Sequence, residues 1–308
     1  MYKRKCLVTG GLGFIGRHVA NELLRRGHDV LVYDISNTKV VFKQSSIVII
    51  NGDILDLQKL KKCMQDVQDV YHLSGMLGTS ELFNDPHRAV DINIHGALNV
   101  LEAAIQMGVE KLFYPTKPNE WKNLYSATVQ TVEHCCLAFQ QAYGLDVRIL
   151  KLWNVYGPHQ KLYPVRKAVP MFIFQALHGL PLEVYGDGSQ MVELLYVEDA
   201  GRVIIDYVHL PRVFNEPLEV GFGTKMTVNE LAKAIIQLCD SSSRIVHVPM
   251  RRGEAFIQKF TYLDNITRYL DHFIPTPLHE GLKRTIKYYR EISLDEVVQT
   301  KRFYYGNR

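Results

Sequence analysis

A glycine-rich turn near the amino terminus constrains the fold more than any other feature of this sequence. Gly10, Gly13 and Gly16 follow the apolar run 6–8, and the segment 17–26 continues with the apolar periodicity of a helix. In a strand–turn–helix unit, Gly10 permits a tight turn, Gly13 lets phosphates approach the backbone, and Gly16 lets the helix pack closely on the strand. The free N–H groups at the start of the helix then face negative charge. The segment therefore predicts a site for the pyrophosphate of a dinucleotide.

An acidic residue at the end of the next strand indicates that the dinucleotide is NAD rather than NADP. The apolar run 30–33 ends in Asp34. A carboxylate in this place accepts both ribose hydroxyls of NAD and repels the extra phosphate of NADP. We therefore expect NAD as the cofactor, bound by the three glycines, by Phe14 and Ile15 at the helix start, and by Asp34.

Composition and charge argue against other classes of protein. The chain has 308 residues, 47% of them hydrophobic, and no apolar run approaches the ~20 residues of a membrane span. The segment 1–5 lacks the apolar stretch of a secretory signal, and the five cysteines include no CxxC pair, so we expect reduced thiols and a cytoplasmic location. The net charge of +4 is scattered along the chain, which gives nucleic-acid binding no specific support. His72 and His134 lack further ligands at metal spacing, so we expect no metal.

Strands and helices alternate through the first half of the chain. The patterns predict strands at 46–50, 67–73, 112–114 and 147–152, and helices at 57–64, 86–107 and 125–143. This alternation predicts an α/β fold in which a doubly wound parallel sheet carries helices on both faces.

The rhythm changes after Pro158, where glycine and proline become frequent and the strands become short. We predict an NAD-binding Rossmann domain at 1–155, to which 193–223 returns. A smaller α+β substrate-binding domain then comprises 156–192 and 224–290, with helices near 169–178 and 228–238. The tail 291–308 has no clear period, and no element or role is predicted for it.

Short segments spread over nearly the whole chain resemble a known family, the extended short-chain dehydrogenase/reductases that act as nucleotide-sugar epimerases and dehydratases. The matching segments are Thr9–Gly16, Asn51–Ile54, Val70–Leu73, Asp91–Asn93 with Gly96, Trp153–Pro158, Val184–Gln190, Tyr196–Asp199 and Arg251–Glu254. The resemblance implies an NAD that stays bound through the cycle and a nucleoside diphosphate sugar between the two domains.

The resemblance also implies roles for individual residues. Asp53 and Ile54 would flank the adenine, Leu73, Ser74 and Gly75 would line the cofactor groove, Asn154 and Arg251 would meet the diphosphate, and Tyr185 would lie beside the nucleotide base. Each polar residue has a simpler alternative: a turn-capping carboxylate for Asp53, a local turn bond for Asn154, and surface charge for Arg251. Tyr185 at a strand end could equally be a core residue.

The expected catalytic pair is incomplete. The family places a tyrosine and a lysine four residues apart on one helix, so that the ammonium lowers the pKa of the phenol. Tyr125 is present, but Val129 occupies the lysine position. A phenol with a pKa near 10 is ionised to only about one part in a thousand at neutral pH, so catalysis should be slow unless another cation substitutes. Lys117 and Lys122 are the nearest candidates, and the alternative for both is solvated loop charge.

The residues before Tyr125 also depart from the family pattern. Thr116 ends the strand that presents a catalytic Ser or Thr, so it is the candidate for a hydrogen bond to the sugar hydroxyl; its alternative is a threonine that merely ends a strand. Sugar 4,6-dehydratases continue with an Asp-Glu pair, whereas this chain has Lys117-Pro118. Glu120 is the only carboxylate in the loop between Pro118 and Tyr125, and it could serve as the missing acid or have a structural role.

Three functions remain open. The chain could be an NAD-dependent epimerase that oxidises the sugar at C4 with Tyr125 as the base. It could be a non-standard dehydratase in which Glu120 or another acid acts on the neighbouring carbons. It could also bind NAD and nucleotide sugar with little or no turnover, as a degenerate member or a chain with a Lys-to-Val substitution.

We also expect a homodimer. The predicted helices 86–107 and 125–143 carry apolar residues on more than one face, including Val132, Cys136 and Phe139 beside Val129. Such helices can pair with those of a second copy in a four-helix arrangement.

Overall fold

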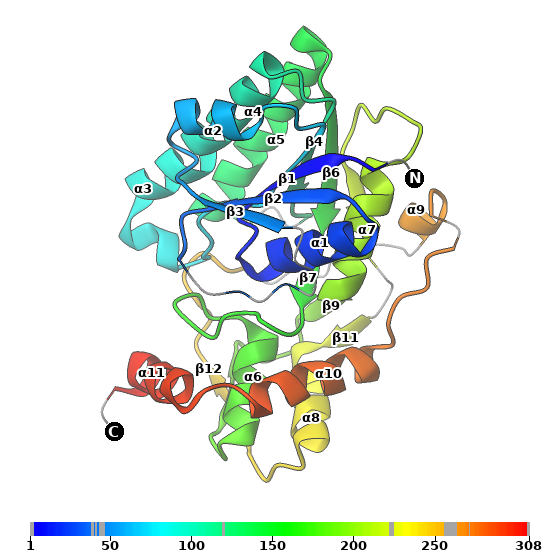
Figure 1. The fold of residues 1–308 in the computed structure, drawn as a ribbon. Coiled ribbons are helices and arrows are strands. Elements are labelled where there is room, and N and C mark those ends of the chain that lie inside the picture. Colours follow the sequence, from blue (N-terminus) through cyan, green and yellow to red (C-terminus); the bar gives the residue numbers. More distant parts are fainter. Residues whose placement is uncertain are drawn as a thin grey trace.

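The central element of the structure is a parallel sheet of seven strands with helices on both faces (Figure 1). The structure is a computed structural model and describes residues 3–37, 40, 42, 47–118, 121–221, 225–255, 264–270 and 272–306. The strand order is β10 (Leu218–Val220), β6 (Asp146–Leu152), β5 (Lys111–Thr116), β4 (Asp69–His72), β1 (Lys5–Thr9), β2 (Asp29–Asp34) and β3 (Ile47–Asn51). All six pairings in this sheet are parallel, which confirms the predicted doubly wound sheet.

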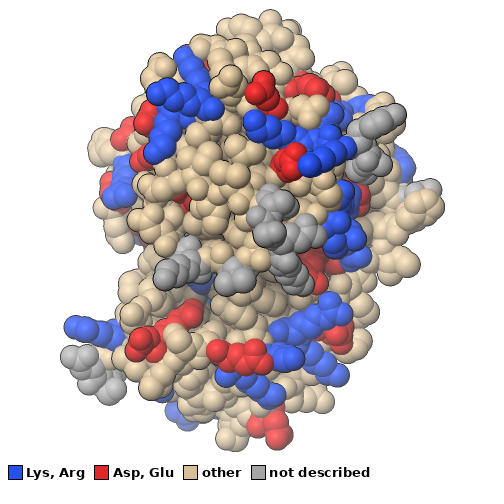
Figure 2. Space-filling view, in the orientation of Figure 1, with Lys and Arg blue, Asp and Glu red and all other residues tan. Residues whose placement is uncertain are grey.

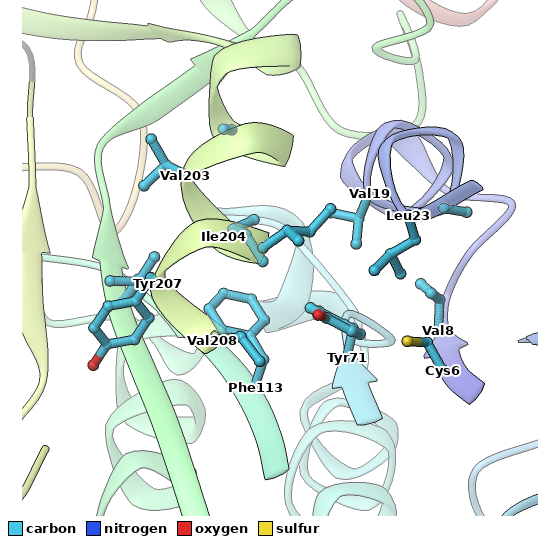
Figure 3. Close-up of a cluster of buried hydrophobic side chains, with 14 of the residues drawn as sticks. Cys6, Val8, Val19, Leu23, Tyr71, Phe113, Val203, Ile204, Tyr207 and Val208 are labelled. Carbon is cyan, nitrogen blue, oxygen red and sulfur yellow. The ribbon is translucent and has the colours of Figure 1, made fainter. Parts of the chain in front are cut away.

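Alternate side chains of the strands pack into two separate apolar layers, as the pleat requires. In β1, Cys6 and Val8 belong to one layer and Leu7 to the other. The first layer lies under α1 (Phe14–Arg25) and α7 (Val197–Val208), and the second under α2 (Leu57–Cys63), α4 (Gly96–Gln106) and α5 (Leu124–Tyr143). Figure 3 shows Val19 and Leu23 of α1 and Ile204 of α7 meeting above the strands. Both faces of the central strands β1 and β4 are buried, as is typical of a parallel sheet covered on both sides.

The helix expected over 86–107 is interrupted in its middle. The structure has α3 (Pro86–Val90), a π-helical turn (Asp91–His95) and then α4. This turn carries Asn93, whose buried side chain bonds to the loop after β4 and to α5. A single π-helical turn inside an α-helix often marks a functional region.

The second part of the chain forms two small sheets and a group of helices below the main sheet (Figure 1). One sheet contains β7 (Asn154–Tyr156), β9 (Met191–Tyr196) and β11 (Lys225–Thr227), and the other pairs β8 (Leu182–Tyr185) with β12 (Ile245–Val248). The helices are α6 (Ala168–Leu177), α8 (Val228–Cys239) and α10 (Leu278–Arg290), which share a third apolar core. After β9 the chain returns to the main sheet through α7, which packs on α1, and β10, which pairs with β6; the short α9 (Asp264–Thr267) contacts β10.

The tail contains a helix that was not predicted, α11 (Leu294–Tyr305). Ser293 caps it by accepting a hydrogen bond from the backbone N–H of Glu296 at 3.2 Å. The Tyr304 hydroxyl donates to the Leu162 carbonyl at 2.9 Å, and Gln175 donates to the Tyr305 hydroxyl at 2.8 Å. The Ser-x-x-Glu pattern at 293–296 was the available signal for the helix start, but the tail has no clear apolar period.

Charge is mixed on the described part of the face that Figure 2 shows. On the described part of the face shown in Figure 2, Lys and Arg side chains alternate with Asp and Glu rather than forming a continuous basic stripe. Within the described residues, no helix is both long and apolar enough to cross a membrane.

Candidate active site

The glycine turn lies where the strand order reverses. The chain moves outward from β1 through β2 to β3 and then returns to the other side of β1 with β4, so the carboxyl ends of β1 and β4 are adjacent. Gly10 has a φ of +70°, and a Cβ atom there would lie 2.8 Å from the carbonyl carbon of Leu73 and from the backbone nitrogen of Ser74. Ligands of doubly wound sheets bind at such a reversal point. The structure thus brings Leu73 and Ser74 directly against the turn.

The start of α1 is open to an anion. Gly13 is the N-cap residue without a side-chain hydrogen bond, and the first turn carries no acidic residue. A Cβ atom on Gly16 would lie 2.1 Å from the carbonyl oxygen of Gly10, so only glycine allows the helix to lie this close to the turn. The exposed N–H groups and the helix dipole of such an end favour a pyrophosphate.

Arg17 adds a positive charge to this turn. Its guanidinium donates to the carbonyl oxygens of Leu12 at 2.9 Å and Gly13 at 3.2 Å. The sequence interpretation did not single out this residue, although a basic residue directly after the third glycine was the available signal.

Asp34 is fixed beside the turn by the backbone. Its side chain accepts hydrogen bonds from the N–H groups of Leu12 and Ser36, both at 2.9 Å, and the residue is 9% exposed. A carboxylate held in this position fits the ribose hydroxyls of NAD. The turn, the uncapped helix and this carboxylate together fit an NAD molecule.

The residues expected around the adenine have structural contacts of their own. The Asp53 carboxylate accepts from the Leu55 N–H at 3.0 Å, which is the turn-capping role considered as its alternative. The Ile54 side chain is 5% exposed and packs against Gly96, where a Cβ atom would lie 2.4 Å from the Ile54 Cδ1. A contact of either residue with the adenine stays a prediction.

Asn93 is a positioning residue that the sequence interpretation missed. Its side chain accepts from the Met76 N–H at 2.6 Å and donates to the Met76 carbonyl at 3.0 Å and to the Thr128 hydroxyl at 3.1 Å. It also lies next to Gly75, where a Cβ atom would be 3.4 Å from the Asn93 Oδ1. The loop after β4 is therefore attached to the helix that carries Tyr125. An amide at a helix position otherwise flanked by apolar residues was the signal in the sequence.

The candidate catalytic residues meet at the end of β5. Thr116 is 5% exposed, and its hydroxyl has no hydrogen-bond partner among the described residues. The Lys117 Nζ lies 5.4 Å from the centroid of the Tyr125 ring and 5.0 Å from that of Trp121. Tyr125 is half-buried in the first turn of α5, and this burial raises the pKa of its phenol to about 12. The structure thus places Thr116, Lys117 and Tyr125 together.

Val129 and Lys122, the other described candidates, have different surroundings. Val129 is 5% exposed and packs in the apolar layer beneath α5. Lys122 is exposed. Further along α5, Glu133 forms an ion pair with Lys151 at 3.1 Å. Glu120 lies outside the described residues.

Tyr185 and Arg251 meet at the edge of the second part of the chain. The Arg251 guanidinium lies 5.6 Å from the centroid of the Tyr185 ring, and that of Arg166 lies 5.5 Å from it. The Arg251 side chain is only 12% exposed and pairs with Glu81 at 2.6 Å, so the alternative of a solvated surface charge is wrong. Asn154 is exposed on β7 and donates to the Glu193 carbonyl of the neighbouring strand β9 at 3.1 Å, which is a bond between strands and not the local turn bond considered as its alternative.

Lys167 is a further charged residue that acts on Lys117. Burial and the charge of Lys167 lower the pKa of Lys117 to about 8, and the charge of Glu254 opposes this shift. Burial also lowers the pKa of Lys167 itself and raises that of Glu254. No pattern in the sequence had pointed to Lys167.

Comparison with known proteins agrees with this geometry. The model of the NAD dependent epimerase/dehydratase family matches residues 6–217. The chain belongs to this family. NAD is its cofactor.

Individual relatives cover almost the whole chain. A UDP-N-acetyl-alpha-D-glucosaminuronate decarboxylase from Bacillus cytotoxicus is 32% identical over 95% of this chain and 100% of its own length. The structure of a UDP-glucose 4-epimerase from Thermotoga maritima with UDP-glucose is 28% identical, with a TM-score of 0.86 over 93% of this chain and 99% of its own. That of a Thermus thermophilus UDP-glucose 4-epimerase with NAD is 26% identical, with a TM-score of 0.84 over 94% of this chain and 100% of its own.

Proposed function

We propose that this chain oxidises and re-reduces C4 of a UDP-linked sugar, with Tyr125 as the base and Thr116 as a hydrogen-bond partner of the sugar hydroxyl. The observation that carries this proposal is the buried Thr116 hydroxyl, which has no partner among the described residues and lies in the segment that contacts Tyr125. A buried hydroxyl without a partner is costly unless a ligand supplies the missing bond.

In the oxidation, the hydrogen on the 4-hydroxyl oxygen and the hydrogen on C4 go to different acceptors. The Tyr125 phenolate takes the proton of the 4-hydroxyl, while the hydrogen on C4 leaves as a hydride with the electron pair of its C–H bond and the C4–O bond becomes a carbonyl. NAD, when bound, would accept this hydride from C4 and return it in the reduction. The Thr116 hydroxyl orients the sugar oxygen, and Tyr125 returns the proton when the carbonyl is reduced.

A uridine diphosphate carrier is supported by the relatives, which act on UDP sugars or were solved with one. In this chain, Arg251 beside Tyr185 combines a guanidinium with an aromatic ring. A guanidinium binds phosphate oxygens as a fork, and an aromatic ring can lie against a base. We propose these two residues, with Asn154, for the nucleotide end of the substrate.

A second function, binding without efficient turnover, is favoured by one observation. Burial raises the pKa of the Tyr125 phenol to about 12, and α5 carries the buried Val129 in place of the lysine that would lower this pKa. Dehydration would depend on an acid such as Glu120, which lies outside the described residues.

Incubation of the purified chain with UDP-glucose and, separately, UDP-glucuronic acid tests the proposal, with the products analysed by mass spectrometry and NMR. A product of unchanged mass with inverted C4 indicates epimerisation, and products lighter by water or by carbon dioxide indicate dehydration or decarboxylation after the same oxidation. A chain that releases NAD on heating but yields no product supports the binding function instead. A chain that neither contains nor takes up NAD contradicts both.

Tyr125→Phe removes only the phenolic oxygen. We expect turnover to fall by about 10²-fold or more, because a positioned acid–base group contributes about 10²–10⁴-fold, while the NAD content stays the same. Unchanged turnover in this variant would assign the proton transfer to another group.

A further inference from the structure

We propose that Lys117 supplies the positive charge beside Tyr125 that α5 lacks at Val129. This inference rests on the proposed function, because the charge matters for turnover only if Tyr125 exchanges a proton with the substrate. Lys117 directly follows Thr116 at the carboxyl end of β5, so its backbone is fixed by the central sheet.

Two aromatic rings hold the side chain of Lys117 at this position. Its Nζ lies 5.0 Å from the Trp121 ring centroid and 5.4 Å from that of Tyr125. An ammonium within about 6 Å of a ring centroid is attracted by the negative face of the ring. In the part of the chain that the structure describes, no carboxylate oxygen lies within the 4.0 Å of an ion pair with this nitrogen. Its ammonium forms no ion pair with a described carboxylate, although the charge of Glu254 acts on it from a greater distance, so the ammonium is not committed to one carboxylate partner.

The electrostatic surroundings support this role. Burial and Lys167 lower the pKa of Lys117 to about 8, so the side chain remains mostly protonated at neutral pH. Burial raises the pKa of the Tyr125 phenol to about 12, so this group has the larger need for a nearby cation. An opposite charge within about 4–6 Å lowers the pKa of an acid by about 1 to 3. The Lys117 Nζ lies 5.4 Å from the centroid of the Tyr125 ring, and its charge favours the phenolate over the neutral phenol. Burial is the cause of the raised pKa of this phenol.

The other nearby lysines do not fit this role. Lys122 is exposed, and Lys151 pairs with Glu133 at 3.1 Å. Lys167 is subject to the charges of Glu81, Arg251 and Glu254, and within the described residues its ammonium makes no ring contact with Tyr125 of the kind that Lys117 makes. Lys117 is the lysine that contacts the Tyr125 ring among the described residues.

Turnover of UDP-glucose and UDP-glucuronic acid by three variants tests the proposal. We expect Lys117→Gln to lower kcat by about 10²-fold, the low end of what a positioned proton-transfer group contributes. Lys117→Arg keeps the charge and should stay within about tenfold of the native chain. Lys122→Gln removes an exposed charge from the same loop and should change kcat by less than about threefold, as a surface charge does. Equal losses in the two glutamine variants, or a native rate in Lys117→Gln, would overturn the proposal.

A spectroscopic titration separates the charge from a merely structural role. The near-ultraviolet phenolate signal of Tyr125 is obtained as the difference between a protein and the same protein carrying Tyr125→Phe. We expect this phenolate to appear at higher pH in Lys117→Gln than in the native chain. An unchanged titration contradicts the proposal, and the measurement requires no substrate.

Placing a lysine on α5 tests whether a second source of charge restores the turnover lost in Lys117→Gln. The double variant Lys117→Gln/Val129→Lys should recover turnover lost in Lys117→Gln, because it returns the charge to the place where the family carries it. If the buried lysine prevents folding, Lys117→Arg serves as the rescue. A native chain that forms no product from either probe would contradict the proposed function, whereas the Tyr125 titration would still decide the role of Lys117.

Discussion

Single residues at the glycine turn are limited by the space around the backbone. A Cβ atom at Gly16 would lie 2.1 Å from the Gly10 carbonyl oxygen, whereas one at Gly13 would lie 3.0 Å from the same atom. The first distance requires the helix to move away from the turn, and the second requires a small adjustment. The two glycines therefore differ in how strictly they are required.

Gly16→Ala should lower the free energy of unfolding by about 1–3 kcal/mol, as overpacking does, even though alanine favours helix. The same shift of α1 should reduce the amount of NAD that co-purifies with the chain. Chemical denaturation and the NAD released on heating measure the two effects. Gly13→Ala is the comparison, and a loss in Gly13→Ala as large as that in Gly16→Ala would contradict the steric explanation.

His72 at the end of β4 makes stability depend on pH. The residue is 3% exposed, burial lowers its pKa to about 4, and its Nδ1 lies 2.8 Å from the Thr9 hydroxyl. An unfolded histidine has a pKa of about 6.5, so below that pH the unfolded chain binds a proton that the folded chain does not. The stabilisation is complete above pH 6.5 and is lost as the pH falls toward 4.

We therefore expect His72→Gln to flatten the decline in unfolding free energy between pH 6.5 and 4, by up to about 1.4 kcal/mol per pH unit. Urea denaturation at several pH values, on both proteins, measures the difference. Parallel curves for the two proteins would show that His72 does not cause the acid sensitivity.

At the scale of an element, α5 connects Tyr125, the proposed base, to both parts of the molecule. Its N-cap Asn123 accepts from the Ser126 N–H at 2.9 Å and donates to the Gly253 carbonyl at 2.8 Å. The segment around Gly253 also packs on Phe83, where a Cβ atom on that glycine would be 3.0 Å from the ring. The position of Tyr125 therefore depends on a residue that caps its helix and on a segment about 130 residues away in sequence.

Asn123→Ala should cost about 1 kcal/mol of stability through the lost cap and should also lower turnover by releasing the start of α5. Asp56 caps α2 in the same way by accepting from the Lys59 N–H, so Asp56→Ala is the matched control. We expect similar melting temperatures for the two variants but reduced kcat only in Asn123→Ala. A similar loss of kcat in both would point to a general loss of stability.

At the scale of the whole molecule, the expected dimer requires a different surface from the one first considered. Val129, Val132 and Cys136 are between 1% and 5% exposed and pack inside the chain's own core. Tyr143 at the end of α5 is 63% exposed, and its ring centroid lies 5.3 Å from that of Phe139. This end of α5 is the remaining apolar candidate on that helix.

We still expect a dimer, with this end of α5 in the interface. Light scattering at micromolar concentration should give twice the mass of the chain, and Tyr143→Glu should shift it toward the monomer because a charge would be buried at the interface. A native chain that scatters as a monomer contradicts the prediction.

The sequence by itself determined the parallel sheet, the glycine turn, the choice of NAD through Asp34 and the absence of a lysine four residues after Tyr125. These features depend on local patterns: apolar periodicity, glycines at a fixed spacing, and an acidic residue at a strand end. The same patterns did not reveal the π-helical turn at 91–95, where Asn93 bonds to the backbone of Met76, 17 residues earlier in the chain. They also missed α11, whose tail has no clear apolar period.

Only the tertiary structure decided which cation lies beside Tyr125. Lys117 and Lys122 were equal candidates in the sequence, since both lie in the short segment before the helix. The fold places one over the Tyr125 ring and leaves the other exposed, and it also shows Arg251 to be enclosed and paired rather than a surface charge. The physical reason is that burial and the distance between charges set the strength of an ionic effect, and both are products of contacts between segments far apart in the chain.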